Sequence, residues 1–233
     1  MTKDFSAFEQ KIGITFNNKD LLMQAFLHRS YLNENRETTL GHNERLEFLG
    51  DAVLELVTTE FLYHKYPKKP EGELTSFRAA LVNTQSIAAA AERLDMNTYL
   101  LLSRGEAKDT GRARQYILAN TFEAVIGSIY LDQGYEVATR FISEHLLPMI
   151  EDIVRKRLWQ DAKSYFQEKA QEAWGHTPTY DVVNEDGPDH DKLFEVVVKV
   201  GDDTRASGKG HSKQEAEQDA ARAALESAGW IEK

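Results

Sequence analysis

Apolar residues recur three and four positions apart along most of residues 4–156. The pattern is clearest at 46–57, 81–94 and 122–131. This spacing places apolar side chains on one face of an α-helix. Turn-forming sequences separate the helical segments, at 66–73, 103–114 and 132–135. The first two thirds of the chain are therefore predicted to be almost wholly helical.

The pattern changes after about residue 157. A helix is predicted at 161–174, ended by Gly175 and Pro178. Two strands are predicted from segments rich in β-branched and aromatic residues, 179–185 (TYDVVNE) and 193–200 (LFEVVVKV). A third, short strand is predicted at about 204–210 (TRASGKG). An Ala-rich helix capped by Ser212 follows at 212–228.

These elements predict a mostly α protein with two domains. The first, residues 1–157, is expected to be all-helical, and the second, residues 158–233, to be a small α-β-β-β-α unit. About 70 residues are enough for such a unit to fold alone.

Composition narrows the classes of function. The chain has no cysteine, which excludes disulfides and thiolate metal sites and favours the cytosol. Its apolar runs are shorter than the ~20 residues that span a bilayer, and its first residues lack the apolar core of a signal peptide. We therefore expect a cytoplasmic protein with no membrane partner.

The charge opposes binding to a polyanion. The formal net charge is −10, from 28 basic and 38 acidic residues. Residues 161–233 hold nine Lys or Arg and sixteen Asp or Glu, a net charge of −7. Because the overall field repels nucleic acid, contact with it must come from a local basic patch or a bound cation.

Four acids line one face of the predicted helix in HNERLEFLGDAVLELV (residues 42–57). On a helical wheel they fall within an arc of about 80°, and they are Glu44, Glu47, Asp51 and Glu55. Leu46, Leu49, Val53, Leu56 and Val57 are predicted on the opposite, buried face. Like charges at these spacings destabilise a helix slightly, so the face is either a solvated surface or a site for something positive.

A second predicted helix offers matching ligands. In ILANTFEAVIG (residues 117–127), Asn120 and Glu123 are three positions apart. Gly127 continues the same face and would let another helix or a ligand approach closely. Oxygen ligands from two helices can form a site for a hard cation such as Mg²⁺.

HNERLEFLGDAVLELV resembles the signature helix of the ribonuclease III family, endonucleases that cut double-stranded RNA. The resemblance extends through YPKKPEGELTSFRAALVN, LSRGEA and ILANTFEAVIGSIYLDQGY. It implies that Glu47, Asp51, Asn120 and Glu123 are metal ligands, with Asp51 and Glu123 catalytic and Glu44 a supporting acid. The implied cofactor is Mg²⁺, with Mn²⁺ as a substitute.

Asn120 departs from the family pattern, which usually has an acid there. An amide oxygen can still bind Mg²⁺, but it brings no charge and should lower the affinity for the metal. Either the enzyme works with an amide ligand, or the chain is a catalytically impaired binder of double-stranded RNA.

The second domain is similar to the double-stranded-RNA-binding domain. Such domains contact two successive minor grooves and the phosphates of the intervening major groove. The resemblance implies an RNA-binding set comprising Ser164, Gln167, Glu168 and Gln171 on one helix face, His190 in the loop, and Lys209, Ser212 and Lys213 at the last helix. An ordinary solvated surface is the alternative for the helix polars. The family's usual second lysine is Gln214 here, so weak, salt-sensitive binding is expected.

The resemblance further implies a homodimer, for which Phe48 is a candidate contact. The implied reaction is Mg²⁺-dependent hydrolysis of phosphodiester bonds in ribosomal and other structured RNA. It leaves 5′-phosphate and 3′-hydroxyl ends with short 3′ overhangs. A helical interaction protein without an RNA role is a weaker alternative.

Overall fold

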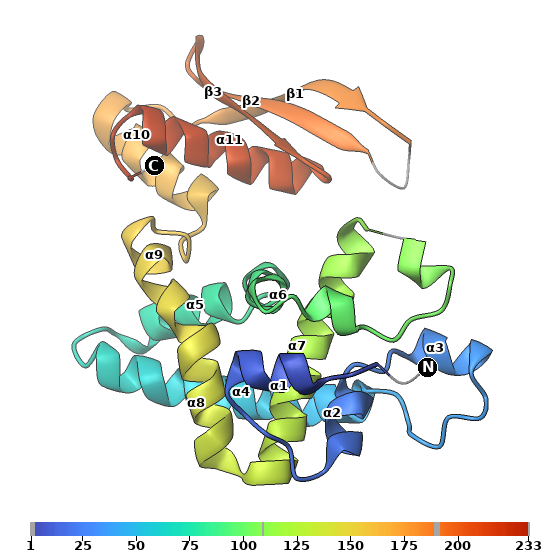
Figure 1. The fold of residues 1–233 in the computed structure, drawn as a ribbon. Coiled ribbons are helices and arrows are strands. Elements are labelled where there is room, and N and C mark those ends of the chain that lie inside the picture. The colour runs from blue at the N-terminus through green and yellow to red at the C-terminus, as the bar shows by residue number, and fades with distance from the viewer. Residues whose placement is uncertain (1–2, 109, 189–191, 233) are drawn as a thin grey trace. The chain divides into compact units, whose positions relative to one another are not determined.

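The computed structural model describes residues 3–108, 110–188 and 192–232. The chain forms two compact units, residues 1–151 and 152–233. The domain limits expected from the sequence, 1–157 and 158–233, stay predictions. Figure 1 shows the helical first unit and the mixed second unit.

The first unit consists of helices. The α-helices are α1 (Ser6–Ile12), α2 (Lys19–Ala25), α3 (Arg29–Glu34), α4 (Glu44–Lys65), α5 (Glu71–Leu81), α6 (Thr84–Arg93), α7 (Arg112–Gln133) and α8 (Tyr135–His145), and α9 (Ile150–Arg155) leads into the second unit. Among the described residues, short 3₁₀ helices join them: η1 (Met96–Tyr99), η2 (Glu106–Lys108) and η3 (Leu147–Met149).

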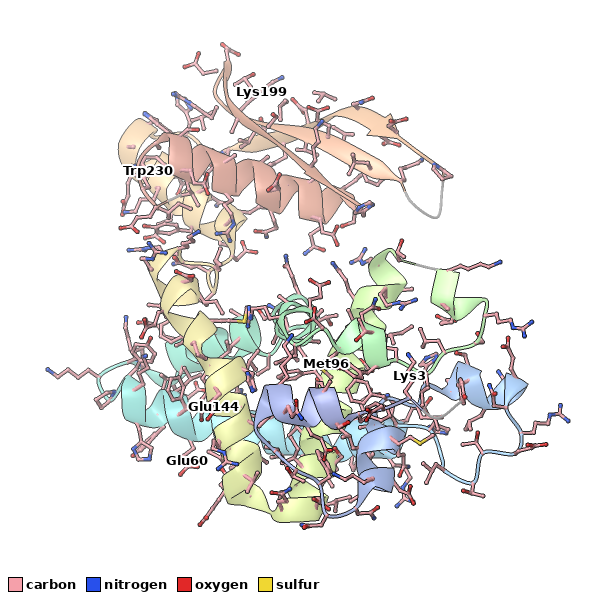
Figure 2. All side chains as sticks on the ribbon, viewed as in Figure 1. Lys3, Glu60, Met96, Glu144, Lys199 and Trp230 are labelled. Atoms are coloured by element: carbon pink, nitrogen blue, oxygen red, sulfur yellow. The ribbon has the colours of Figure 1, made fainter. Side chains whose placement is uncertain are left out.

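Helix α7 forms the centre of the first unit. It packs against α2, α4, α6 and α8, and its side chains Phe122, Val125 and Ile129 are fully buried. Met96 also lies in this interior, whereas Glu144 is at the surface (Figure 2). No helix in the described residues is both long enough and apolar enough to cross a lipid bilayer.

The second unit has the predicted order of elements. It comprises α10 (Ala162–Trp174), β1 (Thr179–Asp186), β2 (Leu193–Val200), β3 (Asp203–Gly210) and α11 (Lys213–Ser227). The strands form an antiparallel sheet in the order β1-β2-β3, and both helices cover the same face of it (Figure 1). The fold class expected from the sequence is thus confirmed.

The core of the second unit is built from small residues on α11 and larger ones opposite. Phe166 of α10 and Val196 and Val198 of β2 pack with Ala220 of α11, and all four are fully buried. The backbone of α11 lies directly on β3, because a Cβ added to Gly208 would be 2.1 Å from the backbone nitrogen of Ala220. Glycine at this position therefore fixes how closely α11 approaches the sheet.

Candidate active site and nucleic-acid interface

Helices α4 and α7 cross at two glycines. A Cβ added to Gly50 would lie 1.8 Å from the carbonyl oxygen of Glu123, and one added to Gly127 would lie 2.2 Å from the carbonyl oxygen of Leu46. Each glycine is thus in contact with the backbone of the other helix. A larger residue at either position would push the two helices apart. Gly127, expected to admit a helix or a ligand, admits α4.

This crossing brings together the carboxylates of Glu47, Asp51 and Glu123. Burial, followed by the charges of Asp51 and Glu47, raises the pKa of Glu123 from its ordinary value of 4.5 to about 8. Burial, followed by the charges of Glu44 and Asp51, raises the pKa of Glu47. Half-buried like charges of this kind are unfavourable unless a cation offsets them.

Asn120 lies in the same cluster. Its side chain makes a hydrogen bond to Glu47 that opposes the rise in the pKa of Glu47. An ionised aspartate at this position has no hydrogen to donate and would add a further negative charge. Asn120 therefore stabilises the cluster in the absence of a cation.

Each of the remaining two acids of the α4 face has an arginine beside it. One carboxylate oxygen of Glu44 is 3.7 Å from Nη1 of Arg29, and the other is 3.7 Å from Nδ1 of His42. Glu55 is paired with Nε of Arg78 at 3.1 Å. The sequence pattern did not single out Arg29 or Arg78, because neither lies on the acidic helix.

The oxygen donors of the cluster fit a hard cation. Carboxylate and amide oxygens are the ligands that Mg²⁺ prefers, usually with several waters retained. Within residues 3–108, 110–188 and 192–232, no three His, Cys, Asp or Glu side chains are already arranged as a metal-binding group.

The outer surface of α4 carries an apolar stripe, consisting of Phe48, Leu56 and Tyr63. These residues are 81%, 57% and 67% exposed, respectively. The prediction that Leu56 lies on the buried face is wrong. The crossing with α7 instead centres the buried face on Leu46, Gly50 and Leu54, which turns Leu56 toward solvent.

The polar face predicted on α10 is exposed to solvent. It consists of Ser164, Gln167, Glu168 and Gln171. Gln171 donates a hydrogen bond to the hydroxyl of Thr177 at 3.2 Å. His190, the candidate for the second minor groove, lies outside the described residues.

The predicted phosphate contacts are at the start of α11. The hydroxyl oxygen of Ser212 accepts a hydrogen bond from the backbone N–H of Glu215 at 3.1 Å and so caps the helix. Lys209 and Lys213 are both exposed. Their ammonium groups lie near the carboxylates of Glu195 and Glu185, respectively.

Hydrogen bonds around Gln218, here called the Gln218 lock, join the two helices of the second unit. The sequence pattern did not predict them. The side-chain oxygen of Gln218, on α11, accepts a hydrogen bond from the backbone N–H of Ala162 at 2.9 Å. The amide of Gln218 donates to Asp161, and Asp161 also caps α10 by accepting from the N–H of Ser164 at 2.7 Å. These bonds fasten the first turn of α10 to α11.

The raised pKa of Glu123 predicts a pH-dependent stability in metal-free protein. Between about pH 4.5 and 8 the folded state keeps a proton on Glu123 that the unfolded state releases. The free energy of unfolding should therefore fall as the pH rises through this window, by on the order of a few kcal/mol. Thermal unfolding in EDTA at pH 5 and pH 8 measures this loss. Glu123→Gln should lose less stability than the unchanged chain, and parallel pH profiles would contradict the prediction.

Comparison with known proteins identifies both units. Residues 18–150 match the ribonuclease-III-like family, and residues 162–227 match the double-stranded RNA binding motif. The ribonuclease 3 of Leptospira interrogans is 44% identical over 220 residues, which cover 94% of this chain and 89% of that protein. The ribonuclease 3 of Protochlamydia amoebophila is 46% identical over 219 residues, which cover 94% and 90% of the two chains.

A solved structure gives the same result for the first unit. The nuclease domain of ribonuclease III from Campylobacter jejuni superposes with a TM-score of 0.56 at 40% identity, and the match covers 62% of this chain and 99% of that chain. The chain therefore belongs to the ribonuclease III family, as an endoribonuclease with a nuclease domain followed by a double-stranded-RNA-binding domain.

Proposed function

We propose that the protein is a Mg²⁺-dependent enzyme that hydrolyses phosphodiester bonds in double-stranded RNA, and that it acts in the cytoplasm on ribosomal and other structured transcripts. The observation that carries the proposal is the meeting of three carboxylates, from α4 and α7, beside the glycine crossing. Their oxygens come from rigid helices, which holds a reacting group more precisely than a loop would.

Glu47, Asp51, Asn120 and Glu123 are the residues that would hold the cation. A bound Mg²⁺ would supply the charge that polarises the scissile phosphate and makes an attacking water more acidic. Asp51 and Glu123 also orient that water by accepting its hydrogens. The hydrogen bond from Asn120 orients Glu47 within the cluster.

The second domain would hold the duplex. The exposed face of α10 offers hydroxyl, amide and carboxylate groups to the ribose 2′-hydroxyls and base edges of a minor groove. Lys209 and Lys213 provide positive charge at the start of α11, where backbone N–H groups also favour a phosphate. Ser212 lies between them and can donate its hydroxyl hydrogen to a phosphate oxygen.

We further propose that the chain forms a homodimer through the apolar stripe of α4. The related Campylobacter jejuni structure is described as having a flexible region involved in dimer formation. A two-fold axis would pair two equivalent cleavage sites. Two sites that face each other across a groove cut opposite strands with an offset, which leaves short 3′ overhangs.

Phe48→Ala should weaken this dimer. Removal of a buried Phe side chain costs about 1.5–3 kcal/mol at each copy of the contact, so the dissociation constant should rise at least about tenfold. Analytical ultracentrifugation across a dilution series measures it. Val183→Ala, an exposed apolar residue of the second unit, is the control, and an unchanged dimer in Phe48→Ala would exclude this stripe as the interface.

Asn120 supports a second candidate function, that of a duplex-RNA binder with impaired catalysis. An amide contributes no negative charge to the cluster, so it should hold a divalent cation less tightly than a carboxylate would. In this alternative the second domain binds RNA and the first serves mainly for assembly.

Cleavage of a long RNA duplex by the purified protein separates the two functions. The unchanged chain should cut in Mg²⁺ but not in EDTA, and it should leave 5′-phosphate and 3′-hydroxyl ends. Asn120→Asp should cut faster and at lower Mg²⁺ concentration. If Asn120→Asp cuts and the unchanged chain does not, the binder function is correct.

A further inference from the structure

Lys209, near the end of β3, and Lys213, the first residue of α11, each have a carboxylate of the sheet beside them. Nζ of Lys209 is 3.7 Å from Oε2 of Glu195, on β2. Nζ of Lys213 is 3.5 Å from Oε1 of Glu185, on β1. Both lysine side chains remain more than half exposed, so a phosphate can reach them from solvent.

The strand register builds these two pairs into the fold. Glu195 is the direct cross-strand partner of Lys209 in the β2–β3 ladder. Glu185 is the cross-strand partner of Phe194 in the β1–β2 ladder, and the ammonium of Lys213 lies 5.7 Å from the centre of the Phe194 ring. The opposite charges of Glu195 and Lys209 face each other across the ladder, which stabilises the sheet modestly.

We infer that Glu185 and Glu195 are internal competitors of RNA, because they occupy the same lysines that a phosphate of the duplex would use. The inference rests on the proposed role of Lys209 and Lys213. When a phosphate approaches, each lysine exchanges a carboxylate partner for a phosphate, and the displaced carboxylate stays close enough to repel the RNA.

This competition sets a threshold for binding. A polyanion that uses these lysines must first displace their carboxylate partners. Displacing one exposed ion pair should lower the binding affinity of the polyanion by about twofold to fivefold. A duplex that also contacts the polar face of α10 gains enough to overcome the threshold. The competitors thus limit non-specific binding through the lysines alone, in keeping with the net negative charge of the domain.

The test is duplex-RNA binding by the full chain in EDTA, which prevents cleavage, measured over a range of salt concentrations. Glu185→Gln and Glu195→Gln should each bind about twofold to fivefold more tightly at low salt. The gain should shrink at high salt, because screening weakens both the pair and the phosphate contact. Asp203→Asn is the control, since it removes the same charge beside Arg205 at the opposite end of β3 and should change the affinity little.

A double-mutant cycle separates this inference from the proposed function. Lys213→Ala should weaken RNA binding, and if it does not, the proposed role of Lys213 fails. Adding Glu185→Gln to Lys213→Ala should then give a smaller gain than Glu185→Gln alone, limited to the effect of Lys192, whose Nζ is 3.4 Å from Oε2 of Glu185. If Lys213→Ala weakens binding but Glu185→Gln leaves it unchanged or weaker, or if Glu185→Gln gives the same gain without Lys213, the competition is disproved while the RNA contact stands.

Discussion

Replacing Glu123 with glutamine is expected to reduce the rate of duplex-RNA cleavage in Mg²⁺ by about a thousandfold or more. Glu123 is the carboxylate that α7 brings to the cluster, and it is half-buried beside Asp51 and Glu47. Glutamine keeps the shape but removes the charge that a divalent cation needs. Loss of several kcal/mol of transition-state stabilisation corresponds to a rate reduction of this order. Single-turnover cleavage of a defined duplex measures it.

Glu55→Gln is the matched control for this variant. Glu55 lies on the same arc of α4 as Glu47 and Asp51, but it is paired with Arg78. Its replacement should change the cleavage rate by no more than about threefold, within the range of a surface ion pair. Both variants should bind duplex RNA in EDTA as the unchanged chain does. Equal losses of activity in Glu55→Gln and Glu123→Gln would show that the α4–α7 cluster is not the active site.

Gly50→Ala and Gly127→Ala are expected to disrupt the folding of the first unit. A methyl group at Gly50 would lie 1.8 Å from the carbonyl oxygen of Glu123, and one at Gly127 would lie 2.2 Å from that of Leu46. The obstructing atoms are backbone, so the two helices must move apart. The cost should exceed the ~1–3 kcal/mol of ordinary overpacking in a core. Thermal unfolding followed by circular dichroism measures the loss.

Gly72→Ala provides the control for the glycine variants. Gly72 lies in α5 with no neighbouring atom within 4 Å of an added Cβ, and alanine is the better helix former. Its melting temperature should be unchanged or slightly higher. The second unit has its own core, so RNA binding in EDTA should survive in Gly50→Ala. If Gly50→Ala has the same melting temperature as the unchanged chain, the helices do not cross at these glycines.

The periodicity of the sequence predicted the helices and the acidic face, but not the position of the α4–α7 crossing. A helical wheel relates residues of one helix, whereas the crossing depends on which other helix packs there. For this reason the helical wheel predicts the wrong face for Leu56, and it does not predict the arginines beside Glu44 and Glu55. Glycines in the middle of two long helices, at Gly50 and Gly127, were the signal that could have located the contact.

In the second domain, the order of elements and the exposed polar face of α10 followed from the sequence. The pairs of Lys209 and Lys213 with carboxylates did not, because the first depends on strand register and the second on how α11 packs on the sheet. Register comes from which residues of neighbouring strands are paired, and composition alone does not fix it. The Gln218 lock likewise joins α10 and α11 across 56 residues of sequence.

The central claim is that side-chain oxygens of α4 and α7 together hold a divalent cation, and direct Mn²⁺ binding tests it without any RNA. Electron paramagnetic resonance of free Mn²⁺ should reveal saturable binding to the unchanged chain that Mg²⁺ displaces. Asp51→Asn, on α4, and Glu123→Gln, on α7, should each weaken it by about tenfold or more, and Glu55→Gln should leave it unchanged. Equal Mn²⁺ affinity in all four proteins would contradict the claim.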